Sequence, residues 1–232
     1  MQKSDSTFAN RSLMRGEATV FWPFYHYLSP YIRQQSSLLN LGSGISFAFE
    51  TYCRELNSNL EICSIDRLQP EIVPTTINRF CIADIESEFD LGGNIKFDMV
   101  CLFEVIEHVD KTDVLIQNAV RYCRKGGIVA ISFPNLSSLY SRLELLMGFQ
   151  PHILEVSNDR ANFGTGIFGD FNNPTNQPIH HIRGITSRAG RELVRYHGLK
   201  IRDVIGTSGG RFHSIWKNLP GLAPVNLMIC EA

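Results

Sequence analysis

Short apolar runs alternate along the chain with segments in which apolar residues recur every three or four positions. The runs are typical of buried strands, and the spaced segments are typical of amphipathic helices. We expect strands just before Gly42 and over 60–65, 79–82, 97–103, 128–133, 200–205 and 225–230. The alternation predicts one α/β domain, with a Rossmann-like, doubly wound and mostly parallel sheet that carries helices on both faces.

Four segments have the spacing of helices: 47–56, 113–123, 136–147 and 187–197. We expect the second helix to end at residues 125–127 and the third to end at Gly148, with its apolar side packed on the core. Thr186 is expected to cap the fourth helix. The aromatic segment 20–28 is interpreted as a helix that packs on the sheet, with a role in lining a site as the alternative.

The whole chain, 1–232, is expected to form a single domain. Residues 1–36 form an N-terminal tail and helix in this prediction. Residues 149–185 have no sustained period and are rich in Asn, Gly, Phe and Pro. Because a loop of this length is usually functional or disordered, we interpret it as an insertion on the substrate side.

Composition excludes several classes of protein. The chain is 44% apolar and its net charge is −1, which gives no electrostatic reason to expect a nucleic-acid partner. No apolar run approaches the length of a membrane span, and the polar N-terminus lacks the layout of a signal peptide. The six cysteines form no close pairs and are expected to be reduced thiols. We therefore expect a cytoplasmic protein.

A glycine turn follows the first predicted strand, in residues 37–46 (SLLNLGSGIS). A turn from a strand into a helix presents backbone N–H groups and a positive dipole end. Gly42 and Gly44 would allow a sharp bend and the close approach of a ligand. By itself the turn is equally compatible with a plain connection and with a cofactor loop.

Acidic residues follow the next three predicted strands. They are Asp66, Asp84 and Glu104. In an open parallel sheet, ligands bind outside the carboxyl ends of the strands. Acids at this edge indicate that hydroxyl groups, amines or a cation are held there.

The order of these motifs resembles that of class I S-adenosylmethionine-dependent methyltransferases. The glycine turn, the acids after the second and third strands, residues 97–109 and residues 124–135 match in sequence order. The resemblance implies a seven-stranded sheet with the last strand antiparallel, and S-adenosyl-L-methionine as the cofactor. The residues implied to bind it are Asn40, Gly42, Ser43, Gly44, Asp66, Arg67, Asp84, Ile85, Phe103 and Glu104, with N–H groups of the turn facing the cofactor carboxylate.

Two positions depart from the family pattern. Asn40 stands where an acid is usual, and Ser46 stands where a third glycine is usual. A nicotinamide- or flavin-binding site would need a glycine at Phe47, so that alternative is weak.

Glu104, Glu107 and His108 would share one face of a helix. This E-x-x-E-H pattern resembles the metal-holding segment of small-RNA 3′-end methyltransferases and ubiquinone-pathway O-methyltransferases. His181 lies five residues before Thr186, as does a later histidine of the former family. The catalytic residues implied are Glu107, His108 and His181, as a general-base group or, as the less favoured alternative, as ligands of a divalent metal.

Residues 133–151 and 181–186 resemble methyltransferases of bacterial glycan and small-metabolite pathways. The implied activity is methyl transfer to an oxygen of a small-molecule or glycan acceptor. The alternative is a non-catalytic protein with the same fold that acts through a protein partner.

Overall fold

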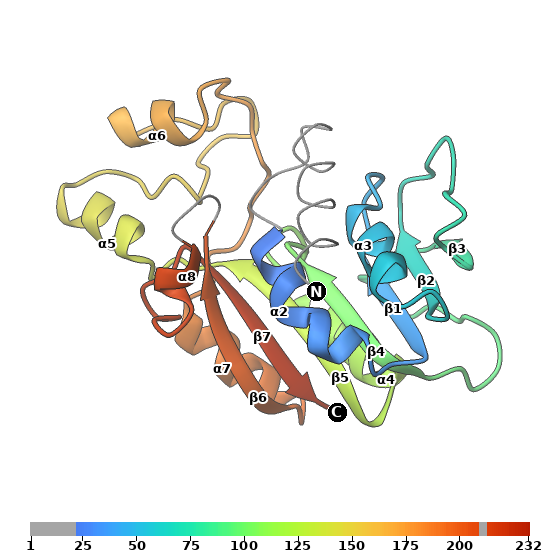
Figure 1. Ribbon diagram of the computed structural model, residues 1–232. Coiled ribbons are helices and arrows are strands. Elements are labelled where there is room, and N and C mark those ends of the chain that lie inside the picture. The colour runs from blue at the N-terminus through green and yellow to red at the C-terminus, as the bar shows by residue number, and fades with distance from the viewer. Residues whose placement is uncertain (1–21, 209–212) are drawn as a thin grey trace.

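The computed structural model describes residues 22–208 and 213–232. Seven strands form one sheet in the order β3-β2-β1-β4-β5-β7-β6 (Figure 1). The strands are β1 Ser37–Leu41, β2 Glu61–Asp66, β3 Arg79–Ile82, β4 Phe97–Phe103, β5 Cys123–Pro134, β6 Lys200–Thr207 and β7 Val225–Glu231. The helices are α2 Trp22–Ile32, α3 Ala48–Leu56, α4 Thr112–Tyr122, α5 Leu139–Leu146, α6 Ile167–Asn172, α7 Ser187–Tyr196 and α8 His213–Trp216.

β7 is antiparallel to both of its neighbours, β5 and β6, while β1 to β5 pair in parallel. The predicted sheet, mostly parallel with its last strand antiparallel, is confirmed. The order of the strands reverses between β1 and β4, and this is the point where open α/β sheets place their ligands.

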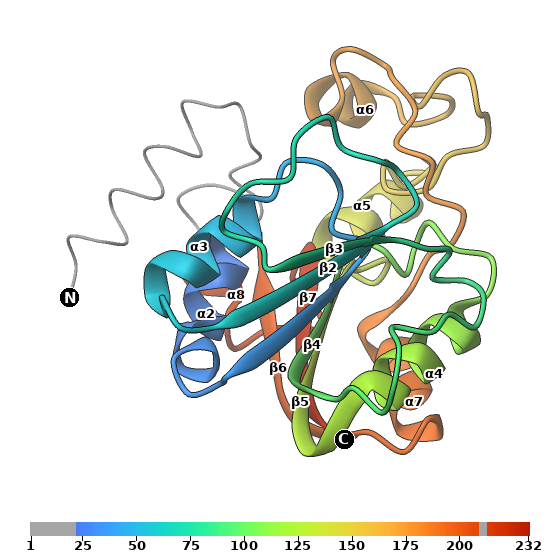
Figure 2. The same cartoon turned by 90° about the vertical axis from the view of Figure 1, so that its right-hand side faces the viewer.

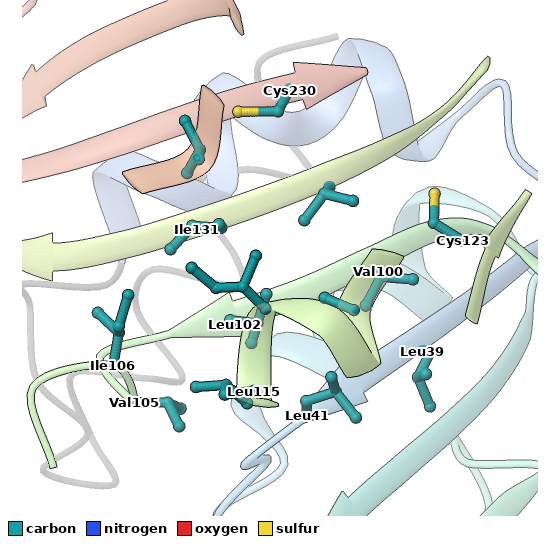
Figure 3. Packing of buried hydrophobic residues seen from close by; sticks show 14 of the residues in the cluster. Leu39, Leu41, Val100, Leu102, Val105, Ile106, Leu115, Cys123, Ile131 and Cys230 are labelled. Carbon is teal, nitrogen blue, oxygen red and sulfur yellow. The ribbon is translucent and has the colours of Figure 1, made fainter. Parts of the chain in front are cut away.

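Helices cover both faces of the sheet, as predicted. α2 and α3 lie on one side and α4 and α7 on the other (Figure 2). The cores are two clusters of buried side chains, one for each face. Figure 3 shows the first, in which Leu115 of α4 packs with Leu39, Leu41, Val100 and Leu102 of the strands. The residues between these on the same strands, such as Leu38 and Met99, belong to the second cluster because side chains alternate across a sheet.

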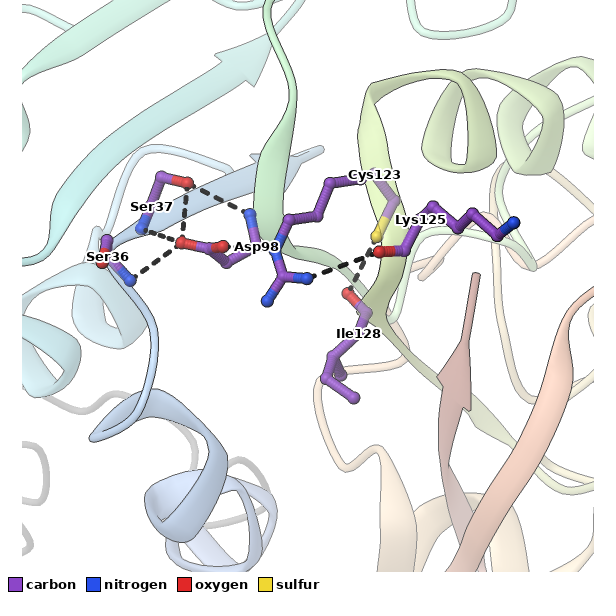
Figure 4. Close-up of polar contacts among 7 residues, drawn as sticks. Ser36, Ser37, Asp98, Cys123, Lys125 and Ile128 are labelled. Atoms are coloured by element: carbon purple, nitrogen blue, oxygen red, sulfur yellow. Dashed lines mark hydrogen bonds and ion pairs between the residues drawn. The ribbon is translucent and has the colours of Figure 1, made fainter.

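A hydrogen-bond cluster joins β1 to β4 at the opposite edge, where these strands begin. Asp98 Oδ2 accepts the backbone N–H groups of Ser36 and Ser37, each at 2.9 Å (Figure 4). Its other oxygen pairs with Arg124 Nε at 2.5 Å. These bonds fix the relative positions of β1 and β4, and therefore of the residues at their far ends.

The structure differs from the sequence prediction in β5 and α5. Residues 125–127 were expected to end a helix, but they lie within β5, which pairs with β4 already at Cys123. The expected core packing of the third predicted helix is wrong. In α5, Leu143 and Leu146 are exposed, whereas Ser141 and Glu144 are buried.

The predicted cap at Thr186 is confirmed, because its side chain accepts the N–H of Ala189. The segment 149–185 is not all loop, since it contains α6. All six cysteines are free thiols. Among the described residues, no helix has the length and apolar character needed to cross a bilayer.

Candidate active site

The carboxyl ends of β1, β2 and β4 bring together most of the predicted site residues. Gly42 follows β1, Asp66 ends β2 and Glu104 follows β4. β1 lies between the other two strands, so the glycine turn is flanked by an acid on each side.

The glycine turn is tightly bound to its surroundings. The N–H groups of Gly42 and Ser43 donate to the Ile65 carbonyl at 2.8 and 3.1 Å. The N–H of Gly44 donates to Asp66 Oδ2 at 2.8 Å. The expectation that these N–H groups are free to face a carboxylate is therefore wrong.

Gly42 is required for space. Its φ is +73°, and a Cβ there would lie 2.6 Å from a methyl carbon of Val105. A residue with a side chain would therefore be strained in its backbone and would collide with the segment after β4. The turn thus allows close approach between the ends of β1 and β4.

The left-handed backbone conformation after the turn falls on Phe47, with φ 53°. Its ring is buried and lies against Phe80, with 5.8 Å between the ring centroids. Asn40, where the family usually has an acid, is also buried and donates to Glu50 Oε1 at 2.8 Å.

The acids after β2 and β3 are held by local hydrogen bonds. Asp66 Oδ1 accepts the N–H of Leu68 at 2.9 Å, and Arg67 beside it is exposed. Asp84 accepts from the Ser87 hydroxyl at 2.7 Å and from the Glu86 N–H, and these bonds lower the pKa of its exposed carboxyl.

The backbone at Ile85 is hydrogen-bonded to a residue of α4 that sequence reasoning missed. Asn118 of α4 donates to the Ile85 and Ser87 carbonyls at 3.0 and 2.9 Å. Asn118 is buried within an amphipathic helix, and a polar residue on the apolar face was the signal available.

Glu104 has a left-handed backbone conformation, with φ 52°. Its N–H is bound to Ser132, and Ser132 Oγ donates to its Oε1 at 2.7 Å. Burial raises the pKa of Glu104 to about 7, although the Ser132 bond opposes this. Strain of this kind concentrates at functional sites. Phe103, before it, packs edge-on against Phe49, with 4.8 Å between the ring centroids.

Residues 104–108 do not form a helix, so the predicted shared helical face is wrong. They form a bend and a turn, and α4 begins only at Thr112. The positive φ of Glu104 explains the difference, because it turns the chain away from the strand without starting a helix.

The structure nevertheless brings Glu107, His108 and His181 together. The Nε2 atoms of His108 and His181 lie 3.9 and 3.8 Å from the same Glu107 oxygen. The two rings are 4.7 Å apart. Glu107 is buried, and neither of its oxygens has a hydrogen-bond partner among the described residues.

Backbone hydrogen bonds place His181 beside the turn that contains Glu107 and His108. The N–H groups of Ile182 and Arg183 donate to the Glu107 carbonyl at 3.0 and 3.2 Å. Glu155, which sequence reasoning missed, accepts the N–H groups of Ile179 and His180 at 2.6 and 2.7 Å. Both anchors involve backbone atoms, so no side-chain pattern could reveal them.

Backbone carbonyls set the tautomer of both histidines. His108 Nδ1 lies 3.0 Å from the His180 carbonyl, and His181 Nδ1 lies 2.9 Å from the Ile153 carbonyl. A carbonyl only accepts, so each Nδ1 carries the proton and each Nε2 presents a lone pair.

Burial lowers the pKa of both imidazoles. Burial, together with the charge of Glu104, raises the pKa of Glu107 to about 9. The group therefore favours neutral side chains at pH 7. Such a group can accept a proton through a histidine Nε2, or bind a cation through the lone pairs and the Glu107 carboxylate.

Comparisons with solved structures find the same fold at low identity. A 1,6-didemethyltoxoflavin-N1-methyltransferase from Burkholderia thailandensis, with 1,6-didemethyltoxoflavin and S-adenosylhomocysteine bound, has a TM-score of 0.57 at 13% identity, over 96% of this chain and 81% of that chain. An S-adenosylmethionine-dependent methyltransferase from Mesorhizobium loti has a TM-score of 0.56 at 13% identity, over 91% and 97%. The PH0226 protein from Pyrococcus horikoshii OT3 has a TM-score of 0.58 at 13% identity, over 94% and 90%.

Comparison with curated protein sequences finds no match. A family profile described as a methyltransferase domain matches residues 14–202, which is most of the chain. The chain therefore belongs to the methyltransferase-domain family and is a class I S-adenosylmethionine-dependent methyltransferase, as its motifs predict.

Proposed function

We propose that this methyltransferase acts on an oxygen of a small-molecule or glycan acceptor, with Glu107, His108 and His181 on the acceptor side of the cofactor. One observation carries the proposal: two imidazole Nε2 atoms and the unpartnered carboxyl group of Glu107 converge beside the residue that follows β4. A hydroxyl acceptor must lose a proton as it is methylated, and this group supplies uncharged acceptors for it.

The proposed cofactor position spans the ends of β2, β1 and β4. The ribose hydroxyls are assigned to Asp66, and the adenine to Asp84 and Ile85, with Phe103 beside the ring. Asn40, Gly42, Ser43, Gly44, Arg67 and Glu104 complete the proposed set. Because the N–H groups of the turn are engaged, the role of Gly42 here is to let the segment after β4 pack closely against the turn beside the cofactor.

In the proposed mechanism the chain's own residues orient the acceptor and remove its proton. The sulfonium of the cofactor supplies the methyl group, so the protein needs no further electrophile. The lone pair at Nε2 of His108 or His181 accepts the hydroxyl proton, and the carbonyls of His180 and Ile153 hold the rings in orientation. The positive charge of the imidazolium then lowers the pKa of the neighbouring Glu107 carboxyl, and the ionised form of Glu107 pairs with it.

A divalent cation is the second candidate for the same group. Ligand atoms of Glu107, His108 and His181 lie within 4.8 Å of one another, and the bonds from each Nδ1 to a carbonyl are the support that metal-binding histidines usually have. These residues fit such an ion. When bound, it would lower the pKa of an acceptor hydroxyl.

The segment 149–185 is proposed to face the acceptor. Within this segment, the Ile153 carbonyl accepts the hydrogen bond of His181 Nδ1. The segment also presents exposed aromatic residues, among them Phe163 and Phe171. Aromatic faces suit sugars and other small acceptors, which supports the small-molecule or glycan class.

The test uses Glu107→Gln and His181→Asn, assayed by release of S-adenosylhomocysteine with a panel of hydroxylated acceptors. We expect turnover to fall by at least about a hundredfold, as for loss of a general base. We expect cofactor affinity, measured by calorimetry, to remain within about twofold. The control is His197→Asn, which removes a histidine–carboxylate pair between His197 and Asp113 that takes no part in the group of Glu107, His108 and His181.

Equal loss of turnover and cofactor affinity would contradict the assignment, because it would indicate a structural role. Chelation separates the two candidates. Activity that is lost with EDTA and restored by Mg²⁺ or Mn²⁺ would favour the cation, and activity unchanged by EDTA would exclude it.

A further inference from the structure

A row of side chains crosses three neighbouring strands just beneath the carboxyl edge. Asn40 of β1 lies opposite Ser64 of β2 and opposite Cys101 of β4. All three residues are buried. Two residues further along each strand come Gly42, Asp66 and Phe103 respectively, on the same face of the sheet because side chains repeat every second position.

Glu50, in the first turn of α3, lies over this row. Its Oε1 accepts from Asn40 Nδ2 at 2.8 Å and from Ser64 Oγ at 2.7 Å. Its side chain is 1% exposed, and its Oε2 has no partner among the described residues. Cys101 is near enough that, after burial, the charge of Glu50 is the next cause that raises its pKa.

One carboxylate oxygen thus connects two strands and the helix that leaves the glycine turn. The three elements surround residues 42–44, and the turn itself donates to Ile65 and Asp66 of β2. A shift between β1, β2 and α3 would therefore move the glycine turn relative to Asp66.

We propose that Glu50 is a positioning residue for the cofactor, because its buried accepting oxygen fixes β1, β2 and α3 directly beneath Gly42 and Asp66. The inference depends on the cofactor and not on the identity of the acceptor.

The test measures S-adenosylhomocysteine affinity by calorimetry, at a fixed interval below each variant's own Tm. Glu50→Leu removes the accepting oxygen and leaves two buried donors unpaired. We expect the affinity for S-adenosylhomocysteine to fall by about tenfold or more. Losses of this size are typical when the hydrogen-bond partners of metal-binding residues are removed. Glu50→Gln keeps an accepting oxygen, and we expect its affinity for S-adenosylhomocysteine to stay within about threefold of that of the wild type.

Glu144→Leu is the matched control. Glu144 is also 1% exposed and accepts from His152 Nδ1 at 2.6 Å, but it lies on α5. This variant should lower Tm and leave the affinity for S-adenosylhomocysteine unchanged. Glu144→Leu therefore shows what a loss of general stability alone does to the affinity for S-adenosylhomocysteine.

Equal affinities in Glu50→Leu and Glu144→Leu would overturn the proposal, and so would equal losses in Glu50→Leu and Glu50→Gln. If Glu50→Leu does not fold, Ser64→Ala decides, because it removes one donor from the same oxygen. An affinity lowered by about threefold supports the proposal, and an unchanged affinity overturns it. Acceptor turnover takes no part in this test, so it succeeds or fails separately from the proposed O-methylation.

Discussion

Two of the four non-glycine residues with positive φ in the described part of the chain lie at the carboxyl edge of the sheet. Gly42, Phe47 and Glu104 all have positive φ, at 73°, 53° and 52°. For a residue with a side chain, such a conformation costs about 1–3 kcal/mol and persists only where the surroundings enforce it. The buried ring of Phe47 and the Ser132 bonds to Glu104 are those surroundings.

Gly42→Ala tests the close approach at this edge. The added Cβ would meet Val105 at 2.6 Å, and the backbone would be strained. We expect Tm to fall and S-adenosylhomocysteine affinity to drop by at least about tenfold, equivalent to about 1.4 kcal/mol. Calorimetry and thermal unfolding measure the two effects.

Gly93→Ala provides the control for backbone strain alone. Gly93 has a similar φ of +66°, but a Cβ there would meet nothing within 4 Å. It should cost some stability and leave affinity unchanged. The same affinity in both alanine variants would contradict the steric role of Gly42.

Sequence reasoning found only some of the residues at this scale. The E-x-x-E-H pattern and the spacing to Thr186 identified Glu107, His108 and His181, which do meet in space. It missed Glu155 and the carbonyls of Ile153 and His180, because backbone atoms carry no signature in the sequence. It also assigned no role to Glu50, whose partners come from two strands.

At the scale of elements, the hydrogen bonds of Asp98 connect the two strands that flank the site. Burial by itself would raise the pKa of this carboxyl, but bonds from Arg124, Ser36 and Ser37 outweigh it, and the net pKa lies below the ordinary value of 3.8. Because the pKa of Asp98 is lower in the folded state, its carboxylate stabilises the fold at pH values above the ordinary pKa of 3.8. This contribution is lost as the pH falls through the lower pKa of the folded state.

Asp98→Asn should therefore lower the free energy of unfolding by about 2 kcal/mol at pH 7, the size typical of hydrogen bonds to a charged group. The difference from the wild type should shrink below about pH 4. Denaturant unfolding at several pH values measures it. Asp90→Asn, at an exposed loop position, is the control, and a difference that does not change with pH would contradict the interpretation.

α5 shows how an apolar helical pattern can mislead. Its exposed side carries Leu143 and Leu146, and Leu146 is 82% exposed. Periodicity gives the direction of an apolar face but not whether a neighbour covers it. The inward side of α5 instead carries Ser141 and Glu144, which pair with Ser138 and His152.

Leu146→Lys should accordingly change the free energy of unfolding by no more than about 0.5 kcal/mol, as for other surface positions. Leu115→Ala in α4 is the contrasting variant, since Leu115 is fully buried, and it should cost about 2–5 kcal/mol. Denaturant titration compares the two. A large loss in Leu146→Lys would show that α5 is covered in solution.

At the scale of the whole molecule, the cofactor is assigned to the point where the strand order reverses. A ligand that binds only the folded protein stabilises it by mass action. We expect S-adenosylhomocysteine at a hundred times its Kd to add about 2.7 kcal/mol to the free energy of unfolding. A thermal shift assay measures this, with NAD as the control nucleotide. A shift with NAD and none with S-adenosylhomocysteine would contradict the assignment.

The sequence alone determined the order of strands and helices, the glycine turn and the acids at the strand ends. These are local properties, because the periodicity of apolar residues and the φ of glycine depend on near neighbours in the chain. The tertiary structure decided which distant segments meet. It brought His181 to Glu107, placed Glu50 under Asn40 and Ser64, and left the apolar side of α5 exposed. Such contacts depend on the order of the strands within the sheet and on the path of the segment 149–185. No local pattern in the sequence specifies either of these.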